Sequence, residues 1–380
     1  MAQQLYFSRD TKVYIEIGSA VWEIPVLDGF SFSQATNTSE ITLAEMADSV
    51  GTSRRGRRAF NDSLAPAEWS FSTYARPFIA SGTVAGGGAD DSANHHAVEE
   101  VLWALMAGDA SYTAPVDATS DAAFTGVTYG TSSTTIDFDS SNKVTLGTAS
   151  IYFVLGDANK KVYKITGCVV NEASIDFDID GLATINWTGF GSSISEGSEP
   201  TATITEAITA TSNFIRNRLS TLSVVPTTQD PDGDGTDELQ ASYDLTLTGG
   251  SITITNNITF ITPEELGIVN TPVGHVTGTR SVSGSFTCYL HEDTASDDQS
   301  SDLWQDLKDL TNVVTNSFGL TFQIGGASAP YIKTTMSTCH IDIPTHSIED
   351  VISLETTFMA LPSTMDETDE LVVEYKGVAV

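Results

Sequence analysis

Basic residues are scarce in this chain. Its 380 residues include 17 lysines and arginines against 50 aspartates and glutamates, which gives a formal charge of −33 at pH 7. Such a chain repels polyanions over a range set by the Debye length, roughly 8 Å in physiological salt. Because it has no array of basic side chains to release counterions from phosphates, we exclude a protein that reads DNA or RNA sequence. The same charge suits a surface along which nucleic acid slides without sticking.

Cysteine is also rare. Cys168, Cys288 and Cys339 are far apart and form no Cys-x-x-Cys pair. An odd number of isolated cysteines argues against a disulfide framework and against a zinc site. We predict that all three are buried as small apolar side chains.

Export signals, membrane spans and enzyme motifs are absent as well. The segment Met1–Phe7 lacks the basic stretch and apolar core of a signal peptide, and no run of 18 apolar residues occurs. We therefore expect a protein that is made in, and stays in, a cytosol. No nucleophile elbow, P-loop or dinucleotide fingerprint is present, so we predict no catalytic residue, no enzyme activity and no cofactor. His95, His96, Glu99 and Glu100 share helical spacing that suits a metal, but nothing completes the site and a polar helix start explains the same residues.

What the chain does contain is the composition of a sheet-rich globular protein, with 40% hydrophobic and 18% charged residues. Its length predicts at least two domains. Most informative is an internal duplication, because several segments recur in the same order in both halves. Segments 29–33, 42–46, 69–74, 98–106, 151–156, 175–177 and 182–188 correspond to 250–255, 262–266, 283–289, 303–314, 320–325, 341–343 and 351–357.

Each half therefore follows one plan: two strands, a long arm with a short helical start at its beginning, a strand, one helix and a meander of strands. We predict a mainly β (α+β) fold made of two tandem copies, the first at 1–200 and the second at 201–380. Residues 109–148 occur only in the first copy, and we interpret them as an exposed insertion that contains a hairpin. The composition near 191–211 predicts a linker.

Acidic and apolar residues alternate in Ile175–Asp180. Period-two spacing places Asp176, Asp178 and Asp180 on one face of a strand and three apolar side chains on the other. An antiparallel strand with a solvated face explains this pattern. Asp342 occupies the corresponding place in the second half.

Four of the basic residues fall in one short run of the first arm, at Arg54, Arg55, Arg57 and Arg58. Guanidinium groups pair well with carboxylates, so we interpret this run as a contact with an acidic neighbouring subunit. A solvated arm without a partner remains the alternative. The closing strand, with Leu371, Val373 and Tyr375, is predicted to add to the sheet edge of a neighbour.

The run Asp230–Glu238 has carboxylates two residues apart around glycines, as at the start of a calcium loop. Asp230, Asp232, Asp234 and Asp237 are the candidate ligands. An EF-hand loop would need a glutamate at position 241, where this chain has Ala241. A plain hairpin loop accounts for the same residues, so no metal site is predicted here.

The run Gly29–Ile41, the basic arm and the segment Phe60–Tyr74 resemble those of bacteriophage tail tube proteins. The resemblance is clearest over residues 13–80, and the second half is similar mainly through the duplication. It implies a small β-sandwich or split barrel with a flanking helix in each copy. It also implies a structural virion protein of the tail, assembled in the host cytoplasm, in which three two-copy chains form a ring and the rings stack into a tube.

That resemblance extends to partners and surfaces. It implies that the chain binds copies of itself and, at the tube ends, other tail proteins, and that the arms at 34–68 and 255–280 reach a neighbour. If a tube forms, Asp176, Asp178, Asp180 and Asp342 are candidates to line its lumen, where carboxylates would keep passing DNA from binding. The alternatives are a tandem β-sandwich adhesin or glycan-binding protein with calcium, and a tail-tip hydrolase.

Overall fold

The computed structural model describes residues 5–41, 58–79, 94–108, 110–113, 123–138, 146–157, 159–202, 213–266, 269–292, 298–310 and 317–379. Within these ranges strands predominate, and the α-helices are α1 (Glu100–Ala107) and α2 (Ser300–Asp309). The predicted mainly β fold is confirmed. Neither helix in the described ranges has the length and hydropathy needed to cross a membrane.

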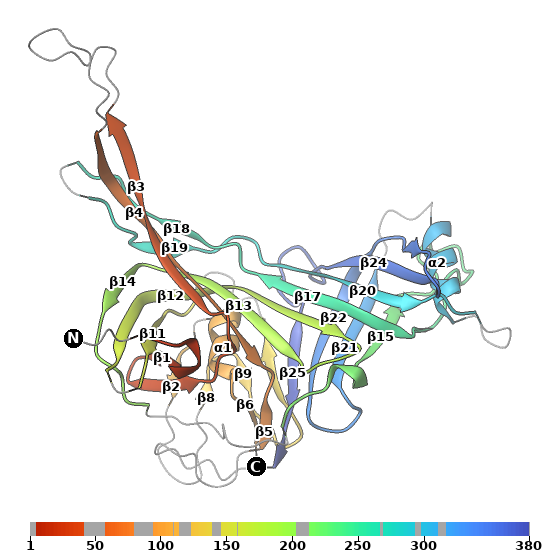
Figure 1. Ribbon diagram of the computed structural model, residues 1–380. Coiled ribbons are helices and arrows are strands. Elements are labelled where there is room, and N and C mark those ends of the chain that lie inside the picture. Colours follow the sequence, from red (N-terminus) through yellow and green to blue (C-terminus); the bar gives the residue numbers. More distant parts are fainter. Residues whose placement is uncertain are drawn as a thin grey trace, which may run out of the picture.

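The central element of the fold is an antiparallel array of strands, which we call the long sheet (Figure 1). Its strands, in spatial order, are β3 (Ser31–Ile41), β4 (Arg58–Tyr74), β13 (Thr184–Gly191), β12 (Lys161–Asp178), β17 (Leu247–Thr255), β20 (Ser281–Tyr289), β24 (Ser353–Ala360) and the short β23 (Thr345–Ser347). Strands β12 and β17 pair from Glu172 opposite Thr255 to Asp178 opposite Gly249. The long sheet therefore crosses the predicted boundary between the two copies.

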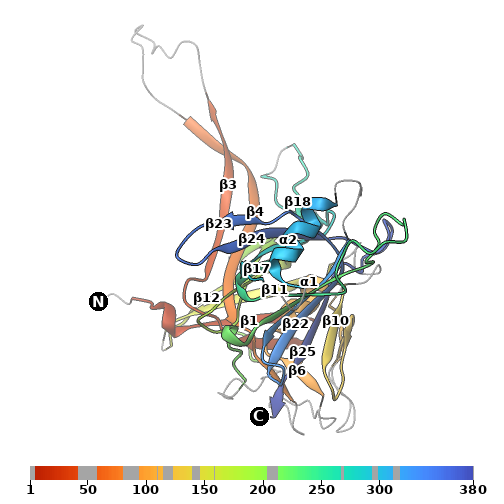
Figure 2. The ribbon, with the colours of Figure 1, turned by 90° about the vertical axis from the view of Figure 1, so that its right-hand side faces the viewer.

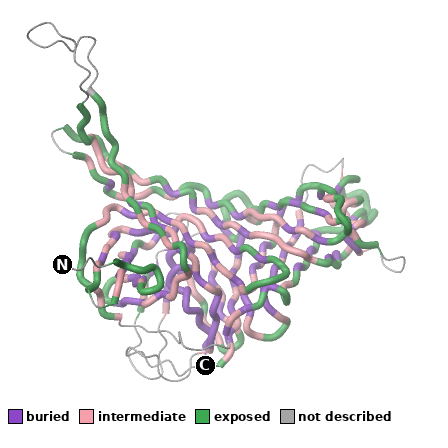
Figure 3. Tube along the Cα trace, in the orientation of Figure 1, coloured by how far each residue is buried: buried purple, intermediate pink, exposed green. Residues whose placement is uncertain are grey.

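One face of the long sheet is apolar, because buried and exposed side chains alternate along its strands (Figure 3). A row of facing residues crosses five strands, and each member is at most 3% exposed: Phe71, Trp187, Ala173, Ile254 and Val282. Burial of such a row removes apolar surface from water, worth about 25 cal/mol per Å². The hydrophobic core lies on this side of the sheet.

Smaller layers of strands cover the apolar face. In the first half they are β11 (Ala149–Leu155), β1 (Thr11–Ile17), β2 (Ala20–Ile24) and β14 (Ser193–Glu196). In the second half they are β22 (Tyr331–Ile341), β21 (Phe318–Gly325), β15 (Thr221–Pro226), β16 (Tyr243–Asp244) and β25 (Val372–Lys376). Phe32 of β3 stacks on Phe153 of β11 with ring centroids 4.5 Å apart, and Phe177 meets Phe322 at 5.4 Å. The result is a sandwich in each half.

Helix α1 is enclosed by these layers, and all of its residues are buried. Trp103 packs edge-on against Trp187 of the long sheet, with centroids 4.9 Å apart. The helix begins at Glu100, and Gly108 is its C-cap. Residues His95–Ala97 do not belong to the polar helix start that the sequence suggested; they form strand β6, because they pair with β5 (Pro77–Ile79).

The described part of the 109–148 insertion is not the exposed segment that the sequence predicted. It contains β7 (Tyr112–Thr113), β8 (Ala123–Phe124), β9 (Val127–Thr128) and β10 (Thr134–Asp137). A hairpin is present, since β9 pairs with β10, but it is not an exposed elaboration. Strand β10 also pairs with β25, and Ile136 and Phe138 are at most 1% exposed. These residues are therefore part of the core.

Two arms extend from one end of the long sheet and lie side by side (Figures 1 and 2). The first is the β3–β4 hairpin, and the second contains β18 (Thr259–Ile261) and β19 (Gly274–Val276). The Leu64 amide donates a 2.8 Å hydrogen bond to the Asn270 carbonyl, and the Asn270 amide donates one of 3.2 Å to Asp62. The short helical start predicted at 262–266 is wrong, because residues 262–265 have no regular secondary structure and Leu266 lies in a turn. Its counterpart at 42–46 lies outside the described residues.

Candidate functional site: the polar face of the long sheet

The face of the long sheet opposite the core carries small polar side chains in register. One row consists of Ser72, Asn186, Ser174, Thr253 and Ser283. A second row consists of Thr184, Asp176, Ser251, Ser285 and Thr357. These rows cross both halves of the chain without interruption.

Hydrogen bonds link neighbouring members of the rows. Asn186 accepts from the Ser72 hydroxyl at 2.7 Å, and its Nδ2 donates to Ser174 at 3.4 Å and to Oδ2 of Asp176 at 3.2 Å. Ser251 and Ser285 are 3.2 Å apart on the next pair of strands. Cross-strand polar pairs of this kind each contribute about 0.2–1 kcal/mol. The face is thereby held as a network of hydroxyl, amide and carboxylate groups, and its two rows contain no lysine or arginine.

The predicted acidic strand has the expected alternation over most of its length. Ile175 and Phe177 are buried, and Asp176 and Asp178 are exposed. Beyond Asp178 the strand ends, so Asp180 lies in the following turn. Ile179, which was expected on the apolar face, is 41% exposed for the same reason.

Asp342 adjoins the same polar face. It follows the end of β22, its amide donates a 3.0 Å hydrogen bond to the Thr357 carbonyl, and its carboxylate accepts from the Thr357 hydroxyl. Since Thr357 belongs to the row that contains Asp176, both carboxylates lie on one sheet face. The hydroxyl-rich rows themselves were missed in the sequence. Their signal was the period-two serine spacing in Ser70-Phe71-Ser72 and in Ser283-Gly284-Ser285.

The two terminal strands of the long sheet have an unpaired edge within the described residues. Strand β3 pairs only with β4, and β23 pairs only with β24. Unpaired edges present free N–H and C=O groups that can pair with another chain. Ile343 and Ile348, which flank β23, are 52% and 80% exposed.

The closing strand is placed differently from the sequence prediction. Strand β25 pairs with β22 on one side and β10 on the other, so it has no edge for a neighbour. Leu371, Val373 and Tyr375 are at most 1% exposed. The prediction that these residues contact another subunit is corrected: they complete the core of their own chain.

The arginine run of the first arm is only partly described. Arg58 begins β4 and is exposed, whereas Arg54, Arg55 and Arg57 lie outside the described residues. Their contact role remains a prediction.

The acidic loop brings several carboxylates together. Asp230, Asp232, Asp234 and Glu238 have carboxylate oxygens within 4.8 Å of one another, so Glu238 takes the place predicted for Asp237. Burial and the three aspartates raise the pKa of Glu238. Asp230 accepts hydrogen bonds from the amides of Gly233 and Gly235, at 2.7 and 2.9 Å. Such turns explain the loop as a plain hairpin connection.

The histidine pair lies in a buried polar cluster beside α1. Nδ1 of His96 lies 3.1 Å from Oε2 of Glu100, and the Arg76 amide donates to both carboxylate oxygens of Glu99 at 3.2 Å. Burial raises the pKa of Glu99 to about 7, which its hydrogen bonds and the Arg76 guanidinium partly oppose. The His95 and His96 rings and the Glu99 and Glu100 carboxylates each have a hydrogen-bond partner within the chain.

The three cysteines are free and buried, as predicted. Burial raises the pKa of the Cys288 and Cys339 thiols to about 12 and also raises that of Cys168. All three are therefore unreactive thiols at neutral pH.

The fold and this face define a class: a β-rich protein whose long sheet has a polar face between two edges that are unpaired within the described residues. Comparison with known proteins gives the family. A family model described as phage tail tube protein matches residues 101–360. The tail tube protein pb6 of Escherichia phage T5 is 30% identical over 360 residues, which cover 92% of this chain and 69% of pb6.

The chain therefore belongs to the phage tail tube protein family, and it is a structural protein of the virion tail. The residues matched by the family model begin beyond 13–80, the segment in which the sequence resemblance is clearest. Both matches are tail tube proteins, which favours this assignment over the adhesin and the tail-tip hydrolase.

Proposed function

We propose that three chains close into a ring through the unpaired edges of the long sheet, and that such rings stack into a tube. The polar face would then line the lumen through which phage DNA passes. The observation that carries this proposal is the pairing of β12 with β17, which already joins the two halves of one chain edge to edge. A joint of the same kind between β23 of one chain and β3 of the next would continue the sheet around a ring.

Strand order supports two tandem copies, at 1–200 and 201–380. The first half contributes β3, β4, β13 and β12 in that order, and the second contributes β17, β20, β24 and then β22 with β23. In the first half Ala173 lies opposite Trp187, which lies opposite Phe71. In the second half Thr356 of β24 lies opposite Phe286 of β20. On the other side of β24 the pairing with β22 ends at Ile341, and Ile343 lies two residues further along the chain. By strand register Ile343 thus takes the place of Ala173, at the edge of the sheet, which differs by four residues from the sequence correspondence of 341–343 with 175–177.

The difference between these two positions indicates where a neighbour would lie. Ala173 is fully buried because β17 covers it, whereas Ile343 is 52% exposed. Strand β3 of the next chain would cover Ile343 as β17 covers Ala173. Burial of this side chain would add to the main-chain hydrogen bonds of the joint.

The charge of the polar face supports a role as a lumen. Its two rows carry hydroxyls, one amide and the Asp176 carboxylate but no cation, so a passing phosphate backbone would meet no ion pair and would release no counterions. We infer that the chain acts without catalysis and without a cofactor, as a conduit. DNA is then a transient occupant and not a bound ligand.

We also propose that the arginine run of the first arm contacts carboxylates of a neighbouring subunit. Charge reversal at Arg54, Arg57 and Arg58 should block polymer formation while the monomer stays folded. Unchanged polymerisation of this variant would contradict the contact role.

The experiment that tests the proposed function is negative-stain electron microscopy of the concentrated, full-length protein. We expect rings and tubes with a central channel and three two-lobed subunits around it. A monomer that persists at high concentration and over time would contradict the proposal. Rings with another number of lobes would contradict only the trimer.

A further inference from the structure

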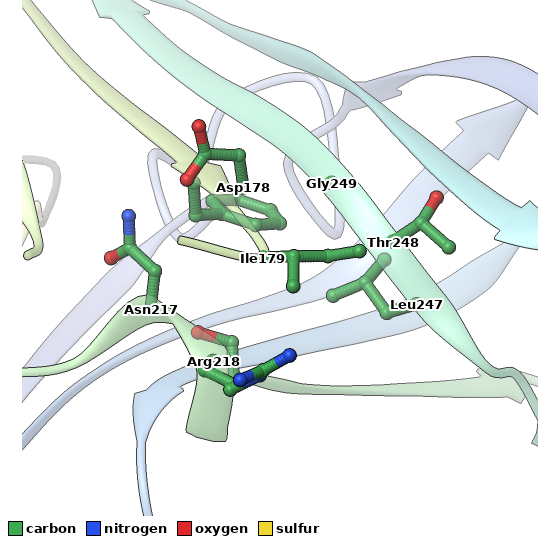
Figure 4. Close-up of a pocket in the computed structure, with 9 residues that line it drawn as sticks. Asp178, Ile179, Asn217, Arg218, Leu247, Thr248 and Gly249 are labelled. Carbon is green, nitrogen blue, oxygen red and sulfur yellow. The ribbon is translucent and has the colours of Figure 1, made fainter. Parts of the chain in front are cut away.

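A pocket of about 210 Å³ lies at the end of the long sheet, between β12, β17 and the short helix η3 (Asn217–Leu219). Figure 4 shows its labelled walls, with Asp178 and Ile179 on one side, Asn217 and Arg218 on another, and Leu247–Gly249 on a third. It therefore combines apolar side chains with a cation.

This pocket and the arms are at opposite ends of the same strands. In the pairing of β12 with β17, Asp178 opposite Gly249 is the pocket end and Glu172 opposite Thr255 is the arm end. After Thr255 the chain runs into β18 and β19 of the second arm. Stacking by translation along the strands would bring an arm of one molecule to the pocket end of another.

The pocket end carries two arginines that form no ion pair within the described part of the chain. Within the described residues, Lys12, Lys160, Lys161, Lys164, Lys333 and Arg280 each form an ion pair with a glutamate. Arg216 and Arg218 are exposed, and no ion pair joins either of them to a described residue. In a chain with formal charge −33, two such neighbouring arginines are complementary to an acidic partner.

Polar and apolar groups beside these arginines also lack partners. The carboxamide oxygen of Asn217 is buried and accepts no hydrogen bond from the described part of the chain. An unsatisfied buried acceptor is costly. Leu219 and Ile179 are 54% and 41% exposed. A docking segment that is acidic and ends in an apolar residue would meet all of these groups.

The second arm presents such a segment. After β18, Pro263, Glu264, Glu265 and Leu266 are exposed, and Leu266 is 101% exposed. The side-chain oxygen of Asn270 accepts a 2.9 Å hydrogen bond from the Glu265 amide, which holds the segment in place. Glu264, Glu265 and Leu266 are therefore accessible to a partner, and no described residue covers the leucine side chain.

We propose that residues Pro263–Leu266 of one chain dock at this pocket of a second copy in the adjacent ring. Leu266 would lie against Ile179, Leu219 and Leu247, and Glu264 and Glu265 would pair with Arg216 and Arg218. The contact is heterologous, because different surfaces meet, and repetition of such a contact produces an open, directional polymer. The inference rests on the proposed stacking of rings and specifies the residues that join them.

The test is a charge-swap series on the full-length protein. Arg216→Glu/Arg218→Glu and Glu264→Arg/Glu265→Arg should each leave rings intact but raise the critical concentration for tubes by about tenfold or more. The two pairs combined should restore elongation to within about threefold of the original protein. Arg9→Glu/Lys308→Glu makes the same charge change at exposed sites away from the pocket and is the matched control. Sedimentation and electron microscopy distinguish rings from tubes.

Two results would overturn the docking inference: tubes from either single swap at the original critical concentration, or a combined variant no better than its parents. Leu266→Ser provides a second measurement, since it keeps all charges and should weaken elongation alone. If the unmodified protein forms no rings, the proposed function fails. If it forms tubes and these substitutions leave the critical concentration for tubes unchanged, only the docking inference fails.

Discussion

The main-chain amide of Gly377 donates a 2.8 Å hydrogen bond to Nδ1 of His95, a residue 282 positions earlier in the chain. Nε2 of the same imidazole lies 3.1 Å from the carbonyl oxygen of Thr131. Because Nδ1 accepts and Nε2 donates, the ring is held neutral with its proton on Nε2. The end of the second half is thereby fastened to the first, next to the parallel pairing of β26 (Val378–Ala379) with β5.

This arrangement predicts acid sensitivity. Burial lowers the pKa of His95 below its ordinary 6.5, with smaller contributions from Lys376 and His96, while the Thr131 hydrogen bond opposes the shift. Below pH 6.5 the unfolded chain binds the proton more readily than the folded chain, so folded stability falls as the pH falls through this range. His95→Asn keeps an acceptor near the Nδ1 position and should lose this part of the pH dependence. Urea unfolding at pH 5 and pH 8 measures it, and His340→Asn, at an exposed site, is the control. Equal pH dependence in both variants would contradict the assignment.

Arg280 and Glu370 form a buried ion pair, with side chains 4% and 7% exposed and a distance of 3.2 Å from Nη1 to Oε1. Arg280 also donates to the Phe138 carbonyl and lies over the Phe138 ring. Arg280→Ala should reduce the free energy of unfolding by about 3–5 kcal/mol, because it leaves a buried carboxylate unpaired.

Two comparisons test this explanation. Arg280→Met/Glu370→Leu, which removes both charges, should cost clearly less than Arg280→Ala. Lys308→Ala, at a surface pair with Asp309, should change the unfolding free energy by less than about 1 kcal/mol. A double variant as unstable as Arg280→Ala would show that packing, and not charge, dominates.

Gly284 lies under an aromatic ring on the core face of β20. A Cβ there would be 2.1 Å from the Ser251 carbonyl oxygen and 2.6 Å from Cζ of Phe358. Gly284→Ala should therefore destabilise the fold by about 1–3 kcal/mol or more, because main chain and ring must both shift. Gly274→Ala in β19 meets nothing within 4 Å and should be close to neutral. Thermal unfolding compares the two, and equal effects would refute the steric explanation.

Replacement of Asp176 by lysine should leave assembly intact but slow DNA ejection, because Asp176 lies on the polar face and away from the docking pocket. One cation per chain on this face would form ion pairs with passing phosphates. Lysine at Asp232 makes the same charge change in an exposed loop outside the long sheet. The measurement is the infectivity and ejection rate of phage assembled with each variant. Full infectivity of the Asp176 variant would exclude a lumen role for this carboxylate.

Local features of the fold were predictable from the sequence, because short-range physics determines them. Period-two alternation identified β12, where Ile175 and Phe177 are buried. Helical spacing identified α2, where Leu303 and Leu307 are buried. The capping box of α2 joins Gln299 and Asp302.

The pairing of strands that are far apart in the sequence was not predictable. The apolar alternation of β25 is compatible with an edge strand and with a central strand equally. The sequence therefore predicts a contact of Val373 and Tyr375 with a neighbouring subunit, whereas β25 pairs with β22 and β10 of its own chain. Likewise, Thr262 and Glu265 have the spacing of a capping box, yet the described residues 262–266 form no helix, because one short turn does not offset the cost of helix nucleation. For the candidate site, the carboxylates were found but the rows of hydroxyls beside them depend on register across strands.

The joint between β12 and β17 also bears on how assembly depends on dilution. In a ring of three such chains, every second sheet joint is made within a molecule, where the local concentration of one edge about the other is on the order of 1 mM for a short tether. Only the remaining joints depend on how much protein the infected cell has made. A two-copy chain should therefore nucleate rings at lower abundance than separate single copies with the same edges.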